Sequence, residues 1–286
     1  RQRTNYSLME VELSQWLTEL AVLHEQSNWS MIGKELDIYI PHAKLAIEID
    51  GLYWHSWHPS TGKMENKTRH LEKTQLATQQ GIQLLHVTDF EWTHQNHIIK
   101  SMILSRLGKN QRIFARKCRV ATVGRAEEKQ FLDQHHIQGY VPSKHALGLY
   151  YDDQLVSLMT IGKSRFSNQQ AHELLRFCSQ GGITVVGGGS KLLDTLRKTY
   201  PHIITYCDLS KSSGHAYEAM GFEFVHDTAP GYFWTDGSRV ISRFRAWKSN
   251  LAKWLPNYDA NLSEAANMFA AGYRRFSDCG NRVFKI

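Results

Sequence analysis

The sequence predicts an α/β protein built from two domains. Its 286 residues are enough for two domains of ordinary size. In the first third, residues 7–25 and 70–80 carry apolar side chains at helical spacing. Strand patterns over residues 36–49 and 82–87 alternate with these helices, which is typical of a small α/β core. From residue 121 onward, short strands joined by tight turns and a glycine-rich loop indicate a separate α+β domain.

Charge and composition narrow the classes of partner. The formal net charge is +7, which favours a polyanion such as nucleic acid. No apolar run reaches about 18 residues and no signal peptide is evident, so we expect a cytoplasmic protein without a membrane span. The cysteines lack C-x-x-C spacing, and we expect reduced thiols, with neither a disulfide framework nor a zinc site. They are Cys118, Cys178, Cys207 and Cys279.

Three carboxylates interrupt a predicted β-hairpin. Residues 36–49 are rich in β-branched and aromatic side chains, and Pro41 marks the turn between the two strands. Asp37 lies in the first strand, and Glu48 and Asp50 project from one face of the second. A single acid in such a strand is usually an edge residue that faces water. Three acids on one hairpin suggest a hard cation, for which Mg²⁺ with oxygen ligands is the best fit.

His55 follows the second strand, beyond a tight Asp-Gly turn. An imidazole beside carboxylates at a strand end can serve as a general acid or base near neutral pH. The alternative is structural, because His55 can also pack among Tyr53, Trp54 and Trp57.

Glu10 has two interpretations of equal weight. Ser7 can cap the first helix, and Glu10 stands at the third helical position of a capping box. A capping carboxylate needs no other role. In the second interpretation, which depends on the resemblance described next, a glutamate of the first helix reaches the metal site. Glu12 is the candidate for that role if Glu10 is not.

The segments that carry these acids and histidines, taken in their order along the chain, resemble the very-short-patch-repair-like branch of the PD-(D/E)xK nuclease superfamily. They are most similar to its phage-encoded homing endonucleases, whose active site is described as EDxHD. The matching segments are residues 7–10, 36–39, 47–56, 70–74, 81–86 and 89–92. One departure is that Glu48-Ile49-Asp50 stands where the parent superfamily has Glu-x-Lys. The repair branch also lacks that lysine and relies on histidine, which places more weight on His55.

The resemblance implies a PD-(D/E)xK-like nuclease core over residues 1–107. It implies a Mg²⁺-dependent DNA endonuclease that acts on double-stranded DNA, as a phage homing endonuclease in an infected bacterial cell would. The implied catalytic residues are Glu10, Asp37, Glu48, Asp50 and His55, and the implied metal ligands are Asp37, Glu48 and Asp50. His70 and Lys73 face the site in the family pattern, whereas by sequence alone they lie on a solvated helix face.

Two basic stretches are candidates for contact with DNA phosphates. A polar loop beside the predicted site carries Lys63, Lys67 and Arg69. Residues 108–120, the expected boundary between the domains, carry Lys109, Arg112, Arg116 and Lys117. This second stretch is either a linker that follows DNA or the first strand of the next domain with charged flanks.

The second half contains a hairpin over residues 147–161 that turns at an Asp-Asp pair. A loop with Gly187, Gly188 and Gly189 then opens a helix. This order resembles the GNAT acyltransferase fold, in which such a loop cradles the pyrophosphate of acyl-CoA on backbone amides. Thr184 replaces the family's basic or amide residue, which argues against acyl-CoA binding.

We therefore expect a GNAT-like domain over residues 121–246 that helps to hold DNA. The alternative function is a GNAT-type acyltransferase acting on nucleic acid or protein, with the N-terminal domain as a targeting module. A third possibility is a binding module without catalysis. Residues 247–286 form a basic and aromatic extension, which suits either nucleic-acid contact or packing against the second domain.

Overall fold

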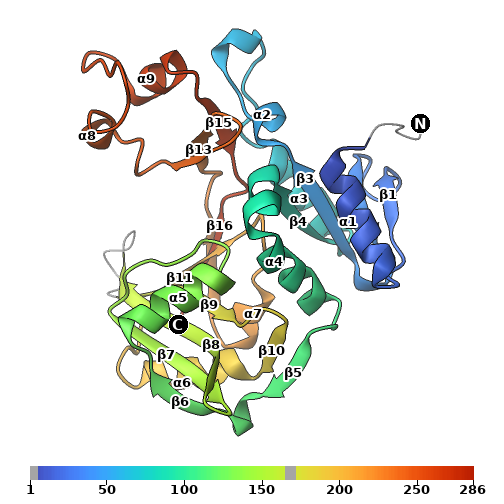
Figure 1. Cartoon of the computed structure of the whole chain (residues 1–286), viewed down its shortest axis with the longest axis vertical. Coiled ribbons are helices and arrows are strands. Elements are labelled where there is room, and N and C mark those ends of the chain that lie inside the picture. Colours follow the sequence, from blue (N-terminus) through green and yellow to red (C-terminus); the bar gives the residue numbers. More distant parts are fainter. Residues whose placement is uncertain (1–5, 165–171) are drawn as a thin grey trace. The chain divides into compact units, whose positions relative to one another are not determined.

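The computed structural model describes residues 6–164 and 172–286, which form two compact units (Figure 1). The first unit contains the chain up to His94, Asp208–Ser212 and Ala229–Asn281. The second contains Gln95–Cys207, Ser213–Thr228 and Arg282–Ile286. The expected ranges 1–107, 108–120, 121–246 and 247–286 differ from this division, because residues 229–281 return to the first unit.

The first unit is built on a four-stranded sheet in the order β1-β2-β3-β4. Its strands are β1 (Glu25–Asn28), β2 (Leu36–Ile40), β3 (Leu45–Asp50) and β4 (Gln83–Thr88). The predicted hairpin is confirmed, since β2 pairs antiparallel with β3 and Ile38 lies opposite Ile47. A 3₁₀ turn at Pro41–Ala43 joins the two strands. Strand β4 lies parallel to β3, so the strand ends at Asp50 and Thr88 meet at one edge.

Helices position the residues that flank this edge. They are α1 (Leu8–Glu19), α2 (Leu52–His55), α3 (Arg69–Gln79) and α4 (Asp89–Arg106), with a 3₁₀ turn at Pro59–Thr61. The capping box of Ser7 and Glu10 is present, as predicted. Helix α1 ends at Glu19, earlier than predicted, because the backbone turns at Ala21 with positive φ. Gln95 interrupts α4 with non-helical backbone angles, and the two units divide there.

Residues 229–281 add a small subdomain to the first unit. It contains β13 (Tyr232–Thr235), β14 (Val240–Ser242), α8 (Lys248–Leu251), α9 (Glu264–Ala270) and β15 (Arg274–Ser277). Strand β13 lies between β14 and β15, and all pairings are antiparallel. The subdomain has its own core around the fully buried Trp234. It joins the rest of the unit through a bridge between Arg275 and Trp57.

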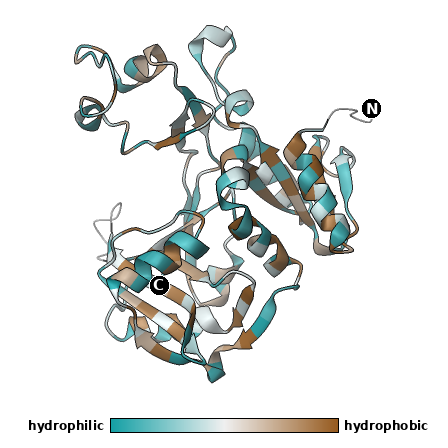
Figure 2. Ribbon diagram, viewed as in Figure 1, coloured by the Kyte–Doolittle hydropathy of each residue, from teal (hydrophilic) through white to brown (hydrophobic). Residues whose placement is uncertain are grey.

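The second unit is an α+β fold with a seven-stranded sheet in the order β12-β16-β11-β9-β8-β7-β6. The strands of the unit are β5 (Gln111–Phe114), β6 (Arg119–Thr122), β7 (His145–Tyr151), β8 (Gln154–Lys163), β9 (His172–Ser179), β10 (Ile183–Val186), β11 (Ile203–Asp208), β12 (Glu223–Asp227) and β16 (Asn281–Lys285). Its helices are α5 (Arg125–His135), α6 (Gly188–Arg197) and α7 (His215–Ala219), and a 3₁₀ turn spans Ala115–Lys117. Hydrophobic residues recur along the central strands, while α5 is largely hydrophilic (Figure 2).

Several expectations for the second unit are met. The hairpin turns at Asp152 and Asp153, both with positive φ, between β7 and β8. The basic stretch over 108–120 contains two strands of this unit, since β5 pairs with β10 and β6 with β7. The α/β class is thus confirmed. In the described part of the chain, no helix is long and apolar enough to cross a bilayer.

Candidate active site

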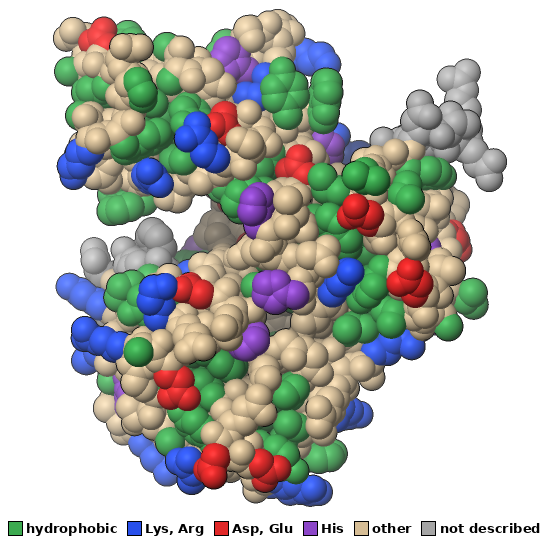
Figure 3. All heavy atoms as spheres, in the orientation of Figure 1, with side chains coloured by type: hydrophobic (Ala, Val, Ile, Leu, Met, Phe, Trp, Pro, Cys, Tyr) green, Lys and Arg blue, Asp and Glu red, His purple; other side chains and the backbone are tan. Residues whose placement is uncertain are grey.

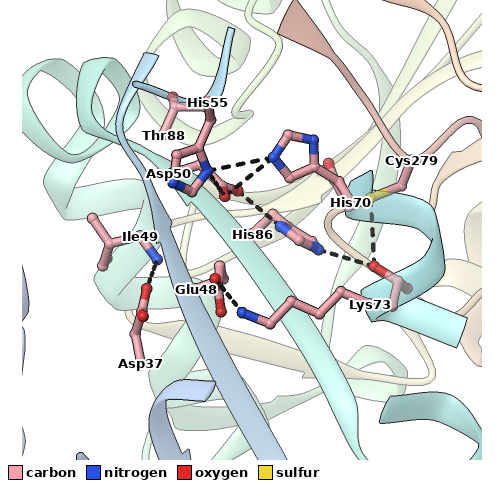
Figure 4. A network of polar contacts seen from close by, with 12 residues as sticks. Asp37, Glu48, Ile49, Asp50, His55, His70, Lys73, His86, Thr88 and Cys279 are labelled. Carbon is pink, nitrogen blue, oxygen red and sulfur yellow. Dashed lines mark hydrogen bonds and ion pairs between the residues drawn. The ribbon is translucent and has the colours of Figure 1, made fainter. Parts of the chain in front are cut away.

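Asp50, the last residue of β3, is the centre of a cluster of three imidazoles (Figure 4). Its carboxylate is 1% exposed. Oδ1 lies 2.8 Å from His55 Nδ1 and 3.4 Å from His70 Nε2, and Oδ2 lies 2.8 Å from His86 Nδ1. The histidines come from α2, α3 and β4, and the parallel pairing of β3 with β4 is what brings His86 beside Asp50.

The buried Asp50 carboxylate and His86 stabilise each other's charges. Burial alone would raise the pKa of Asp50, but His86 and the hydrogen bonds from His55 and His70 hold it well below its usual range. Burial likewise disfavours a charged His86, yet the Asp50 carboxylate raises the pKa of His86 to about 10. Asp50 and His86 therefore form a charged pair at neutral pH.

Asp50, His55 and His70 could hold a metal ion. One ligand atom from each lies within 4.8 Å of the others, and no other such group of three occurs among the described residues. His70 Nδ1 donates a hydrogen bond to the backbone carbonyl of Ser277 at 2.7 Å, which leaves Nε2 facing Asp50. One carboxylate and two imidazoles suit a transition metal better than Mg²⁺.

Asp37 and Glu48 lie outside that group of three. Asp37 Oδ2 accepts a hydrogen bond from Ile49 N at 2.8 Å. Burial, followed by the charge of Glu48, raises the pKa of Asp37 to about 8, and the charge of Glu10 contributes as well. Glu10 itself is buried in the capping box with Ser7. Three acids of the predicted set thus crowd together at a cost in free energy that a cation would offset.

Lys73 brings a positive charge to these acids. Its Nζ forms an ion pair with Glu48 Oε1 (Figure 4). Burial raises the pKa of Glu48 even so. Glu48 Oε2 is buried and has no hydrogen-bond partner in the described structure. A buried carboxylate oxygen without a hydrogen-bond partner fits a divalent cation, since oxygen ligands are what such an ion needs.

The subdomain completes the surroundings of the histidines. His70, already bonded to Ser277, stacks on Phe276 with 4.7 Å between ring centroids. Thr74 Oγ1 lies 2.9 Å from His86 Nε2, at the far side of that ring from Asp50.

Sequence reasoning did not identify His86 or Ser277 as part of the site. A histidine within the apolar strand pattern over 82–87 was the one available signal for His86.

Comparison with known proteins gives weak matches of two kinds. No family model and no curated protein matches the chain. The catalytic domain of homing endonuclease I-Bth0305I is similar at a TM-score of 0.29 and 20% identity, over 36% of this chain and 98% of that one. A Bacillus subtilis acetyltransferase in complex with CoA is similar at a TM-score of 0.34 and 15% identity, over 59% of this chain and 98% of that one. A GNAT family acetyltransferase from Elizabethkingia anophelis with acetyl-CoA bound is similar at a TM-score of 0.33 and 11% identity, over 59% of this chain and 97% of that one.

The basic residues expected to contact DNA all lie at the surface. In the loop of the first unit these are Lys63, Lys67 and Arg69, and in the second unit they are Lys109, Arg112, Arg116 and Lys117. On the face in Figure 3, Lys and Arg side chains are scattered among acidic and uncharged ones. Their contact with DNA stays a prediction.

The glycine loop is explained by packing. Gly187 caps α6 with φ of +76°, a left-handed conformation that favours glycine. A Cβ at Gly188 would crowd Val185, and one at Gly189 would collide with Met220 and Phe177. Gly188 and Gly189 are therefore required by the close approach of α6, and they are not evidence for an acyl-CoA site.

Proposed function

We propose that the first unit is a metal-dependent endonuclease that hydrolyses phosphodiester bonds in double-stranded DNA. The observation that carries this proposal is the set of buried acids and imidazoles at the end of β3. Burying so many titratable groups is costly, and such clusters are typical of catalytic sites. The finer assignment, a phage homing endonuclease in the cytoplasm of an infected bacterium, rests on the resemblance of the motifs.

The buried acids are proposed to hold the metal. Asp37 and the Oε2 atom of Glu48 would be ligands. Asp50 would be the third ligand, since it follows Glu48 on the same face of β3. When bound, a divalent cation such as Mg²⁺ supplies Lewis-acid polarisation of the scissile phosphate and neutralises developing charge. Lys73 places its ammonium beside Glu48, and so provides from α3 the positive charge that the Glu48-Ile49-Asp50 triplet lacks.

His55 is proposed to move the proton. Its described polar contacts all involve Nδ1, which Asp50 Oδ1 engages at 2.8 Å. An imidazole held in this way presents Nε2 as the atom that can take a proton from water or return one to the leaving oxygen. The His55 side chain is 19% exposed, whereas Asp50 is buried, so His55 is the member of the pair that substrate can reach.

The proposal is tested by incubating the full chain with plasmid and phage DNA in Mg²⁺, Mn²⁺ or Zn²⁺, with EDTA as the control. We expect cleavage in Mg²⁺ that EDTA abolishes and that Glu48→Gln reduces strongly. Cleavage in Zn²⁺ but in neither Mg²⁺ nor Mn²⁺ would assign the metal to Asp50, His55 and His70 instead. Absence of cutting under every condition, or equal cutting in EDTA, would refute the proposal.

In the second unit, packing accounts for Gly188 and Gly189, so these two glycines do not favour acyl transfer. Mass spectrometry of the purified chain gives a direct comparison of the two functions. Copurified CoA would support the acyltransferase alternative.

A further inference from the structure

One stretch of the subdomain is strongly basic and carries exposed aromatic rings. Residues 239–258 contain no acid and five bases, namely Arg239, Arg243, Arg245, Lys248 and Lys253. Phe244 and Trp247 lie among these bases and are 64% and 48% exposed. Over the part that Figure 1 labels β13 and α8, Figure 3 shows Lys and Arg side chains beside hydrophobic ones. We call Arg243, Phe244, Arg245, Trp247 and Lys248 the basic aromatic surface.

The backbone beneath this surface is firmly held. Ala246 and Leu251 are fully buried in the subdomain core. Ala246 N donates a hydrogen bond to Ser242 O at 3.1 Å, and Asn250 Nδ2 donates to Phe244 O at 2.9 Å. The fold therefore buries Ala246, between the two aromatic residues, and leaves the Phe244 and Trp247 rings exposed. Large apolar side chains that form an exposed patch usually mark an interaction site.

The two arginines are oriented by aromatic rings behind them. The Arg243 guanidinium lies 5.0 Å from the centroid of Tyr232, and that of Arg245 lies 5.2 Å from the centroid of Trp254. Among the described residues, no ion pair joins Arg243, Arg245 or Lys248 to an acid. Their charges are thus held in place and not neutralised within the chain, which suits a polyanionic partner.

We propose that the basic aromatic surface is a DNA-binding site of the first unit, separate from the catalytic acids. Arg243, Arg245 and Lys248 contact phosphates, and Phe244 with Trp247 stacks on bases of locally unstacked duplex. The two rings are 4.9 Å apart between centroids with 61° between their planes, so each presents its own face or edge to a partner. Charge complementarity and flat exposed rings together favour nucleic acid, because every base offers a face for stacking.

This inference rests on the proposed nuclease function for the identity of the polymer as duplex DNA. The surface and the candidate site belong to the same unit. Strand β15 links them, since Arg275 bridges to Trp57 and Ser277 bonds His70. DNA bound at the surface would therefore be held by the same body that carries the cutting site.

The first test separates phosphate contacts from other effects. Affinity of the full chain for a fluorescent duplex is measured by anisotropy in EDTA across a range of salt. In the Arg243→Gln/Arg245→Gln variant, log affinity is expected to fall less steeply with log salt, with a slope smaller in magnitude by about 2. Each lost phosphate contact removes about 0.9 from that magnitude. Lys34→Gln/Lys44→Gln is the matched control, because both lysines are exposed and distant in sequence from the surface, and it should leave the slope unchanged.

The second test concerns stacking. Trp247→Ala is expected to weaken duplex binding about tenfold with little change in salt slope. Trp29→Ala is the matched control, since Trp29 is 52% exposed and has no Lys or Arg in residues 25–33. Thermal melts of each variant verify that the fold is retained. A tenfold loss for Trp247→Ala that the control does not share supports the inference.

The outcomes distinguish this inference from the proposed function. If the wild type cuts DNA in metal but the surface variants bind duplex as it does, the inference is overturned and the nuclease stands. If the variants lose duplex affinity but no metal supports cutting, the surface stands and the nuclease proposal falls. Equal binding of wild type and variants to duplex, or wild-type preference for anionic phospholipid vesicles over duplex, would also overturn the inference.

Discussion

Asp37 is a carboxyl group whose surroundings oppose its charge. Burial and the charge of Glu48 raise its pKa from near 3.8 to about 8. Between these values the folded state binds more protons than the unfolded state, so the free energy of unfolding falls as pH rises. Without metal, we expect Asp37→Asn to be about as stable as wild type near pH 4, and more stable by roughly 1–3 kcal/mol at pH 8. Urea unfolding in EDTA at both pH values measures this, and a constant difference would contradict it.

The same substitution should remove function. If Asp37 is a metal ligand, Asp37→Asn abolishes cleavage while duplex affinity changes little, because the ligand acts in the chemical step more than in phosphate contact. Asp259→Asn, at an exposed acid of the same unit, is the control and should cut normally. Full cleavage by Asp37→Asn would exclude Asp37 from the metal site.

His55 should matter for rate and not for folding. His55→Gln keeps size and hydrogen bonding near Asp50 but cannot shuttle a proton, so we expect cutting at least about a hundredfold slower with normal DNA affinity. His42→Gln, at the exposed turn before β3, should cut at the wild-type rate. A His55→Gln chain that melts early but cuts normally would assign His55 a structural role, and attention would move to His70.

At the scale of elements, β15 joins the subdomain to the rest of the first unit through Arg275. Its Nε lies 2.6 Å from Glu65 Oε1, its Nη2 pairs with Oε2, and its guanidinium lies 5.5 Å from the Trp57 centroid. Both partners of the ion pair are less than one-fifth exposed. Breaking such a pair leaves a buried charge alone, while replacing both partners does not.

Arg275→Met should therefore destabilise the chain by roughly 2–4 kcal/mol, and Glu65→Leu in the same chain should restore part of that loss. Chemical denaturation of the single and double variants measures the coupling. Arg239→Met is the control, because Arg239 pairs with Asp236 at the surface and should change stability little. Additive losses in the double variant would show that the pair contributes no coupling.

Elements were more predictable than the site they build. Apolar alternation and Pro41 specify the hairpin locally, so the positions of Asp37, Glu48 and Asp50 followed from sequence. His86 did not, because its place beside Asp50 depends on which strand pairs with β3. The contact of His70 with Ser277 did not either, because it depends on a strand far along the chain. A capping carboxylate such as Glu10 also has a complete local explanation, so no local pattern shows that its charge also acts on Asp37.

At the scale of the whole molecule, neither unit is a continuous segment of chain. A chain ending near Leu107 contains the predicted nuclease core but lacks Ala229–Asn281, and with it the bonds of Ser277 and Arg275. We expect this truncated chain to melt well below the full chain, to be cleaved faster by trypsin, and to cut no DNA. Circular dichroism and limited proteolysis measure the first two. A sharp melt together with DNA cutting would show that residues 1–107 suffice.

The hydrogen bond between His70 and Ser277 also sets an order of events during protein synthesis. The two residues are 207 positions apart in sequence. A ribosome adding roughly 5–20 residues per second needs on the order of 10–40 s to make that stretch. For most of that time the nascent chain carries Asp50 and its three histidines without the strand that orients His70. The proposed cutting site would therefore be complete only after the second unit has been almost entirely translated, and fragments from interrupted translation would lack it.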